Sequence, residues 1–301
     1  MAAIDCGTNS VRLLVADVDP QSGSVTDLER RMEITRLGQG VDRDGRFDPE
    51  ALRRTLMVLQ EYADTIRRLD ATALRVAATS ATRDAANRAD FVRGVHDLLG
   101  VDPEVITGRE EAGLSYAGAT RKLSCPEPYL VVDIGGGSTE FVLGDGSAHA
   151  SVSVDIGSVR ITERHFEHDP PVPEQVEAAV VDIDAALDRV SEAVPVGDTA
   201  TLVGVAGTVT TVAGIVLELA EYDPARIHHS RIRMDDVCAV SGRLLSMTHK
   251  ERAANPVIHP GRVDVIGAGA LILSRTLRRL KLQEVMVSEH DILDGLAWSV
   301  A

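Results

Sequence analysis

The stretch Asp5-Cys6-Gly7-Thr8-Asn9-Ser10 stands between two apolar runs, and this pattern predicts a strand, a tight glycine turn and a second strand. Asp133-Ile134-Gly135-Gly136-Gly137-Ser138-Thr139-Glu140 repeats the pattern further along the chain. Glycine tolerates positive φ and leaves the backbone N–H groups of such a turn open to phosphate oxygens. The aspartate before each turn places a carboxylate beside those oxygens, and Mg²⁺ stabilises this arrangement by bridging the two. The two copies therefore predict two facing half-sites for a phosphate compound.

The composition indicates a globular protein of the reducing cytoplasm. A chain of 301 residues exceeds one comfortable core, so we expect two domains. The net charge of −15 and the 3% of aromatic residues argue against nucleic acid as a partner. The longest apolar runs have the length of strands, so we expect no membrane span and no secretory leader. Cys6, Cys125 and Cys238 are too scattered for a disulfide framework or a zinc site.

Strands that alternate with helices predict a largely parallel α/β sheet in the first half of the chain. A third strand is expected near 30–37, after the two strands of the first glycine turn. Asp48, followed by proline, predicts the start of a helix that ends near Arg68. Two later apolar strands run into the polar segments Thr79–Asp84 and Gly108–Ala112, where helices are expected to begin.

The second half of the chain repeats this order of elements. Pro126 and Pro128 mark a turn-rich joint, and the second glycine turn follows directly. A strand at 202–205 runs into Gly207 and Thr208 and then into a helix, so this turn is a third one of a size that suits phosphate. The expected domains are residues 1–126, with a C-terminal helix of about 290–301 packed back on them, and residues 127–289.

Five segments, in this order, give the chain a resemblance to a known family: Asp5–Ser10, Thr79–Asp84, Gly108–Ala112, Asp133–Glu140 and Gly204–Thr208. Over essentially its full length the chain resembles the exopolyphosphatase and guanosine pentaphosphate phosphohydrolase family, within the sugar kinase/actin superfamily. It is most similar to the short form that lacks additional C-terminal helical domains. The resemblance implies an α/β fold of two actin-like (ribonuclease H-like) domains with an active-site cleft between them. It also implies hydrolysis of a terminal phosphoanhydride, a divalent ion, usually Mg²⁺, and a homodimer.

Hydrolysis of a phosphoanhydride needs a group that orients or deprotonates an in-line water. Glu111 matches the position of the family's water-activating carboxylate, and we expect it to be the base. The alternative is that Glu110 and Glu111 merely favour the start of a helix by opposing its dipole. Arg83 is expected to clamp phosphate, because a planar guanidinium matches phosphate oxygens and this one follows two hydroxyl residues at a strand end.

The remaining polar residues of the turns are expected to bind metal and phosphate. We expect Asp133 and Glu140 to bind Mg²⁺, directly or through water, with Asp5 in support. Turn formation is the alternative role for the aspartates, since Asp before Gly is a common turn signal. The first copy is interpreted as having Asn9 and Ser10 in place of a second carboxylate. The expected phosphate ligands are Gly7, Thr8, Asn9, Ser10, Arg83, Gly136, Gly137, Ser138, Thr139, Gly207 and Thr208. On this interpretation one domain supplies the phosphate clamp and the base, and the other supplies the metal.

Three functions remain open from the sequence. The first is an exopolyphosphatase that releases orthophosphate from polyphosphate, and the second is a phosphohydrolase of guanosine pentaphosphate, which would need a pocket for the base. The third is a nucleotide-responsive binding protein or a kinase of the same superfamily, although Gly108–Ala112 favours hydrolysis. The chain also has Ile292-Leu293-Asp294-Gly295 where many family members have Leu-Arg-Glu-Gly. This departure bears on substrate preference and turnover rather than on the fold.

Overall fold

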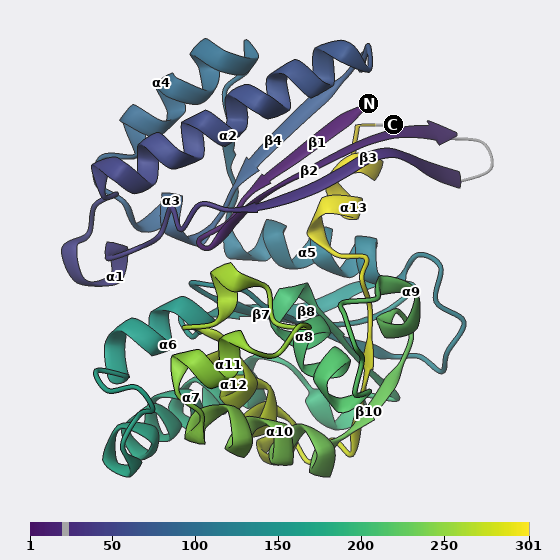
Figure 1. The fold of residues 1–301 in the computed structure, drawn as a ribbon. Helices are drawn as coiled ribbons and strands as arrows, with labels where there is room; N and C mark the ends of the chain where they lie inside the picture. The colour runs from purple at the N-terminus through teal and green to yellow at the C-terminus, as the bar shows by residue number, and fades with distance from the viewer. Residues whose placement is uncertain (20–23, 301) are drawn as a thin grey trace. The chain divides into compact units, whose positions relative to one another are not determined.

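The computed structural model describes residues 1–19 and 24–300, which divide into two compact units. The first unit runs to Gly118 and takes in the C-terminal residues from Ile292, and the second is Ala119–Asp291. Residue 301, the last of the predicted C-terminal helix, lies outside the described residues, as do residues 20–23 of the expected first domain. Each unit contains one sheet with helices, so the predicted α/β class is confirmed (Figure 1).

The first unit is built on a five-stranded sheet with the order β3-β2-β1-β4-β5. β1 pairs antiparallel with β2 and parallel with β4, so the sheet begins as a hairpin and continues as a parallel α/β unit. Its strands are β1 (Ala2–Cys6), β2 (Ser10–Asp19), β3 (Ser24–Ile34), β4 (Leu74–Ala78) and β5 (Glu104–Val105). Its helices are α1 (Val41–Asp44), α2 (Pro49–Arg68), α3 (Ser80–Asp84), α4 (Arg88–Leu99), α5 (Gly108–Thr120) and α13 (Ile292–Trp298).

Both faces of the first sheet are apolar, which explains why helices cover both. Ile4 and Leu13 belong to a buried cluster with residues of α2 and α4, which lie side by side on one face (Figure 1). Ala3 and Leu14 point to the opposite face and join a second buried cluster with α13. Alternate residues of a strand point to opposite faces. Asp5 therefore points to the same face as Ala3.

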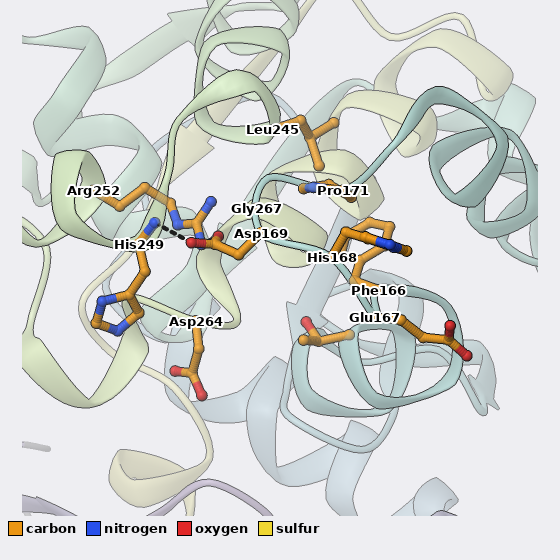
Figure 2. A pocket seen from close by; sticks show the side chains of 11 residues that line it. Phe166, Glu167, His168, Asp169, Pro171, Leu245, His249, Arg252, Asp264 and Gly267 are labelled. Atoms are coloured by element: carbon orange, nitrogen blue, oxygen red, sulfur yellow. Dashed lines mark hydrogen bonds and ion pairs between the residues drawn. The ribbon is translucent and has the colours of Figure 1, made fainter.

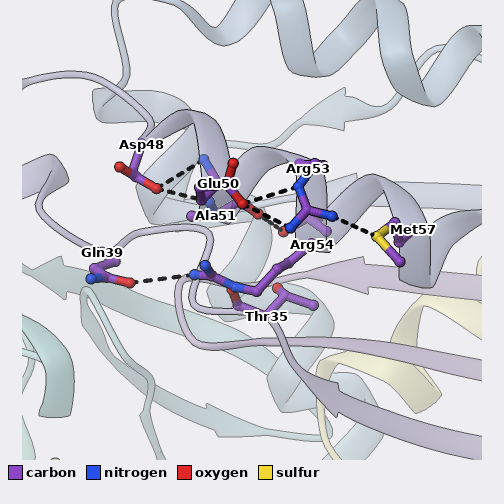
Figure 3. A network of polar contacts seen from close by, with 9 residues as sticks. Thr35, Gln39, Asp48, Glu50, Ala51, Arg53, Arg54 and Met57 are labelled. Carbon is purple, nitrogen blue, oxygen red and sulfur yellow. Dashed lines mark hydrogen bonds and ion pairs between the residues drawn. The ribbon is translucent and has the colours of Figure 1, made fainter.

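The start of α2 is as predicted, with proline as its first residue and Asp48 as its N-cap. The Asp48 carboxylate accepts hydrogen bonds from the backbone N–H groups of Glu50 and Ala51, both at 2.9 Å (Figure 3). Such caps satisfy N–H groups that have no partner within the helix. Further along α2, Arg54 Nε donates to the backbone oxygen of Thr35 at 3.2 Å. This contact ties α2 to the segment that follows β3.

The expected third strand is wrong at both ends, because β3 covers Ser24–Ile34 rather than residues near 30–37. The strand stops at Ile34 because the next two residues turn their N–H groups away from β2. Thr35 and Arg36 both donate to the backbone oxygen of Asn9, at 3.1 and 2.9 Å. The two residues that follow β3 therefore stabilise the first glycine turn.

The second unit is built on a six-stranded sheet with the order β10-β11-β9-β6-β7-β8. β6 pairs antiparallel with β7 and parallel with β9, which repeats the pattern of β1 with β2 and β4. Its strands are β6 (Tyr129–Ile134), β7 (Thr139–Asp145), β8 (Ser147–Val154), β9 (Thr201–Val205), β10 (Arg231–Arg233) and β11 (Glu284–Val287). Its α-helices are α6 (Ser158–His165), α7 (Pro173–Ala193), α8 (Ala206–Val216), α9 (Pro224–Ile227), α10 (Met234–Ser246), α11 (His249–Ala253) and α12 (Ile266–Arg279). The 3₁₀ helices are Val196–Asp198 and Pro260–Arg262.

The segment that departs from the family pattern attaches α13 to the first unit. Leu293 is buried in the apolar cluster on the sheet face that α13 covers. The carboxylate of Asp294 accepts hydrogen bonds from Arg30 Nη2 at 2.7 Å and Nη1 at 3.3 Å. Burial alone would lower the pKa of Arg30, but the charges and hydrogen bonds of Asp294 and Asp27 together outweigh it, and the pKa is raised. In this chain, Leu293 therefore packs in the core and Asp294 forms an ion pair with Arg30, both within the first unit.

Candidate active site

In the first unit, three polar segments emerge at one edge of the sheet. The strands β1, β4 and β5 are parallel neighbours, with Cys6 opposite Ala78 and Ala78 opposite Val105. Each of these residues is at or near the end of its strand, so the segments that follow must leave from the same edge. These segments are the glycine turn, α3 and the start of α5. Ligands of open α/β sheets bind at this carboxyl edge.

Glu111 and Arg83, which the sequence places 28 residues apart, are brought together at this edge. Arg83 Nη1 donates to Glu111 Oε2 at 2.7 Å, and the same nitrogen donates to the backbone oxygen of Ile106 at 3.0 Å. Glu111 is 9% exposed, so its charge is largely removed from water. A nearby guanidinium favours the ionised form of such a carboxylate. The ionised form is the one that can accept a proton.

The two neighbouring glutamates of α5 have different surroundings. Glu110 is exposed, and its carboxylate accepts from the backbone N–H of Thr107 at 2.8 Å and from its hydroxyl at 2.9 Å. The Thr107 hydroxyl accepts in turn from the N–H of Glu110 at 3.2 Å, which completes a capping box. The backbone bond from Thr107, followed by its hydroxyl bond, lowers the pKa of Glu110. Helix capping therefore accounts for Glu110, whereas Glu111 is held in the interior by Arg83.

The second unit has an edge of the same kind. β6, β9 and β11 are parallel neighbours, with Asp133 opposite Val205 and Gly204 opposite Val287. The second glycine turn follows β6, and the Gly207 turn follows β9 as α8 begins. The structure therefore places Gly136–Thr139 and Gly207–Thr208 at adjacent strand ends of one sheet.

Asp133 and Glu140 form a pair across the second hairpin. They lie directly opposite each other in the antiparallel register of β6 and β7, which places their side chains on one face with Cβ atoms about 5 Å apart. Asp133 is 7% exposed and Glu140 is 1% exposed. Ser153 of β8 donates through its hydroxyl to Glu140 Oε1 at 2.7 Å and so fixes that carboxylate. Two of the three predicted metal ligands are therefore side by side.

The hairpin register corrects the interpretation of the first copy. Gly7 N–H donates to Ser10 O at 2.9 Å, and Gly135 N–H donates to Ser138 O at 3.0 Å, so the two turns have the same closing bond. Within this alignment Asn9 and Ser10 correspond to turn residues of the second copy and not to Glu140. The residue opposite Asp5 is Arg12. The sequence interpretation was wrong because it compared residues within the turn, whereas the partner of the aspartate comes from the following strand.

Asp5 has an arginine as its cross-strand partner. Arg12 Nε and Nη2 donate to Asp5 Oδ2 at 3.0 and 2.7 Å. Across the residues that the structure describes, no group of three or more His, Cys, Asp or Glu side chains is arranged to hold a metal ion. A role for Asp5 as a metal ligand stays a prediction, and its bond with Arg12 gives that role no support.

The segments that follow β3 and β8 each approach a glycine turn at a glycine and hold its carbonyl groups, a feature that the sequence interpretation missed. In the second unit Ser158 N–H donates to Gly135 O at 2.9 Å, and Arg160 Nε donates to Gly137 O at 2.6 Å. Gly157 precedes them, and a Cβ there would lie 2.3 Å from Gly136 O. These contacts hold the carbonyl groups of the turn against the start of α6. The signal in the sequence was a glycine after the third strand of each copy.

In the first unit Gly38 has the corresponding role. Its N–H donates to Thr8 O at 2.8 Å, next to the bonds from Thr35 and Arg36 to Asn9 O. A Cβ at Gly38 would lie 2.3 Å from Thr8 Cγ2. Both glycine turns are therefore shaped by a chain segment that approaches too closely for a larger residue.

A cavity of about 220 Å³ lies in the second unit (Figure 2). The residues that line it come from other segments than the strand ends described above. Its lining includes the apolar Phe166 and Leu245 and the acidic Glu167 and Asp264. The guanidinium of Arg252, which also lines it, already donates to the Asp169 carboxylate and to the backbone oxygens of Val263, Leu244 and Met247. An acidic lining with its arginine engaged is unsuited to phosphate, so this cavity is not our candidate for the active site.

Comparison with known proteins gives a consistent result. The model of the Ppx/GppA phosphatase family matches residues 14–300. Exopolyphosphatase 2 of Mycobacterium tuberculosis is 47% identical over 100% of this chain and 98% of its own length. A crystal structure of an exopolyphosphatase-like protein is 42% identical, with a TM-score of 0.95 over 99% of this chain and 97% of that one. The Aquifex aeolicus Ppx/GppA family member is 30% identical, with a TM-score of 0.81 over 99% and 96% of the two chains.

The fold and the site thus define an α/β phosphatase built from two sheets with glycine-turn hairpins. The chain belongs to the Ppx/GppA phosphatase family. Among the helices that the structure describes, none combines the length and hydrophobicity needed to cross a membrane.

Proposed function

We propose that this phosphatase is an exopolyphosphatase, which hydrolyses the terminal phosphoanhydride of inorganic polyphosphate and releases orthophosphate. The observation that carries the proposal is the buried carboxylate of Glu111, held at 2.7 Å by Arg83 at the carboxyl edge of the first sheet. The name of the Mycobacterium tuberculosis relative, at 47% identity over the whole chain, supports the choice of substrate.

Glu111 is the proposed base. Its carboxylate would orient the attacking water and take up its proton, a role that requires the ionised form. Glu110 is not proposed as the base, because its carboxylate is engaged in the capping box of α5. Both hydrogen bonds from Thr107 go to Glu110 Oε2. The proposed phosphate ligands are the residues of the glycine turns, whose backbone N–H groups suit anionic oxygens.

Asp133 and Glu140 are the proposed residues for a divalent ion, which we take to be Mg²⁺. The fit is chemical: like charges directly opposite each other in a sheet repel, and burial increases the penalty, so a cation bound by both carboxylates would stabilise the pair. The set of two carboxylates also suits Mg²⁺, which is commonly held by one or two carboxylates together with water and substrate phosphates. When bound, the ion would neutralise phosphate oxygens.

Substitution of Glu111→Gln tests the proposed mechanism. Loss of a general base lowers rates by about 10²–10⁴-fold, so we expect phosphate release from polyphosphate to fall within this range while the folded state persists. Glu110→Gln is the matched control, because it neutralises the adjacent exposed glutamate, and we expect it to change the rate by less than about twofold. A fully active Glu111→Gln enzyme would show that the base is elsewhere.

The same assay with several substrates tests the proposed activity. Phosphate release is measured side by side on long-chain polyphosphate, tripolyphosphate, guanosine pentaphosphate and ATP. We expect long-chain polyphosphate to have the highest kcat/KM, and a preference for guanosine pentaphosphate would replace the proposal with the alternative activity. We also propose a cytoplasmic homodimer, from the family resemblance, and light scattering of the purified protein measures that state directly.

A further inference from the structure

The contact between Arg83 and Glu111 has a geometry that suits a role for the arginine in holding the carboxylate. Both hydrogen bonds are made by one nitrogen, Nη1, which donates to Glu111 Oε2 at 2.7 Å and to Ile106 O at 3.0 Å. A guanidinium that clamps phosphate uses two parallel N–H groups of its planar fork. In this structure Nη1 of Arg83 joins a carboxylate to the backbone oxygen of Ile106, the residue that follows β5.

The backbone oxygen of Ile106 gives this bridge a fixed anchor. The N–H of Ile106 donates to Ala78 O at 3.1 Å, so the Ile106 peptide continues the parallel ladder between β4 and β5. Glu111 is fixed at its other end, because its N–H donates to Thr107 O at 2.9 Å as α5 begins. Arg83 thus connects the glutamate side chain to the rigid edge of the sheet. A partner of this kind limits the rotation of a catalytic carboxylate, so that the carboxylate stays in the orientation that the reaction needs.

We propose that Arg83 is a positioning residue for Glu111 and acts through that carboxylate, rather than as a clamp on phosphate. Arg83 fixes the direction of the Glu111 carboxylate by the bond from Nη1 to Oε2. The inference rests on the proposed function of Glu111 as the base. It replaces the role that the sequence suggested for Arg83.

The two roles predict opposite kinetics for Arg83→Gln and Arg83→Lys. A positioning residue acts on the chemical step, so Arg83→Gln should lower kcat by about 10–100-fold and change KM by less than about twofold. Lysine supplies one charged nitrogen, which suffices for a bridge made by a single nitrogen, so Arg83→Lys should retain kcat within about fivefold of the original. A clamp would instead lose its fork in both variants and show a raised KM. Arg88→Gln, which removes an exposed arginine five residues further on, is the control.

A double-mutant cycle with Glu111→Gln decides whether the two residues act as one. If Arg83 works through Glu111, Arg83→Gln causes no further loss of kcat in the Glu111→Gln background, whereas an independent phosphate contact gives additive losses. A raised KM with kcat retained, or additive losses, would overturn the inference. If Arg83→Gln does not fold by circular dichroism, the kcat and KM of Arg83→Lys make the decision. Failure of Glu111→Gln to lower activity would overturn the proposed base and this inference together, while additivity overturns only the role of Arg83.

Discussion

The two glycine-turn hairpins of this protein share a backbone and differ in charge at one position. In the first hairpin Asp5 lies opposite Arg12, and in the second Asp133 lies opposite Glu140. The turns themselves close with the same N–H to carbonyl bond, at 2.9 and 3.0 Å. The first aspartate is therefore neutralised within its own hairpin, whereas the second adds to a negative pair. The difference comes from one residue in the strand after the turn, Arg12 or Glu140, and the proposed cation belongs to the second hairpin.

The largest effect is expected at the negative pair, with Glu140→Gln. Glutamine keeps an oxygen that can accept from Ser153 but removes the charge that would hold a divalent ion. Because a bound metal stabilises several kcal/mol of charge in the transition state, we expect phosphate release to fall by about 10³-fold. Calorimetric titration of the protein with Mg²⁺ in the absence of substrate should also show weaker binding.

Glu177→Gln is the control for this prediction, since Glu177 is an exposed glutamate of α7 in the same unit. It removes one negative charge without touching the hairpin. Unchanged Mg²⁺ binding and activity in Glu140→Gln would remove the proposed difference between the two hairpins.

A smaller effect is expected when the first hairpin loses its positive charge, as in Arg12→Met. The change leaves the buried Asp5 carboxylate without the two hydrogen bonds from Arg12 and keeps only the unbranched apolar part of the side chain. Breaking a buried ion pair costs about 3–5 kcal/mol, and because the Arg12 side chain is 19% exposed we expect a lower value of about 2–3 kcal/mol. The free energy of unfolding in urea measures it.

The double variant Arg12→Met with Asp5→Asn tests the reason for that loss. Removing the carboxylate as well removes the unpaired charge, so we expect the double variant to regain part of the stability lost by Arg12→Met. If the double variant is less stable than Arg12→Met by the full effect of Asp5→Asn, the pair contributes nothing to the stability of the first hairpin.

The sequence predicted those parts of the molecule that depend on local signals. Asp48 followed by proline predicted the start of α2, where Asp48 is the N-cap. This signal acts within one turn of a helix, so neighbouring residues suffice to interpret it. The α/β class followed from the alternation of strands and helices, which is also a local pattern.

The parts that the sequence could not predict depend on register and on close approach. The pairing of Asp5 with Arg12 requires the alignment of two strands, and a shift of one residue would turn the arginine to the other face. The ion pair of Arg83 with Glu111 joins segments that meet only because β4 and β5 are neighbours. The sequence shows that residue 157 is a glycine, but it does not show why. The glycine is needed because the backbone of a turn more than twenty residues earlier lies against it.

An effect on stability of similar size is expected from alanine at the two glycines that hold the turns, and here the hairpins should again differ. A Cβ at Gly157 would lie 2.3 Å from Gly136 O and 2.6 Å from Gly137 N, which are backbone atoms of the turn. A Cβ at Gly38 would lie 2.3 Å from Thr8 Cγ2, which belongs to a side chain. A side chain can move aside more easily than the backbone of a closed turn. Overpacking costs about 1–3 kcal/mol, so we place Gly157→Ala at the upper end of this range and Gly38→Ala at the lower end.

The difference can be tested by removing the group that each new Cβ would meet. Thr8→Ser deletes Cγ2 and keeps the hydroxyl, while Ala81 Cβ would still lie 3.0 Å from the new Cβ. Thr8→Ser with Gly38→Ala should therefore recover part of the stability lost by Gly38→Ala alone, as measured by urea unfolding. Gly157→Ala has no such remedy, because the atoms in its way are backbone. It should also lower phosphate release, since the displaced turn follows Asp133 directly. Equal losses for the two alanines, or failure of Thr8→Ser to restore stability, would mean that both turns yield to the same extent and that the hairpins differ only in charge.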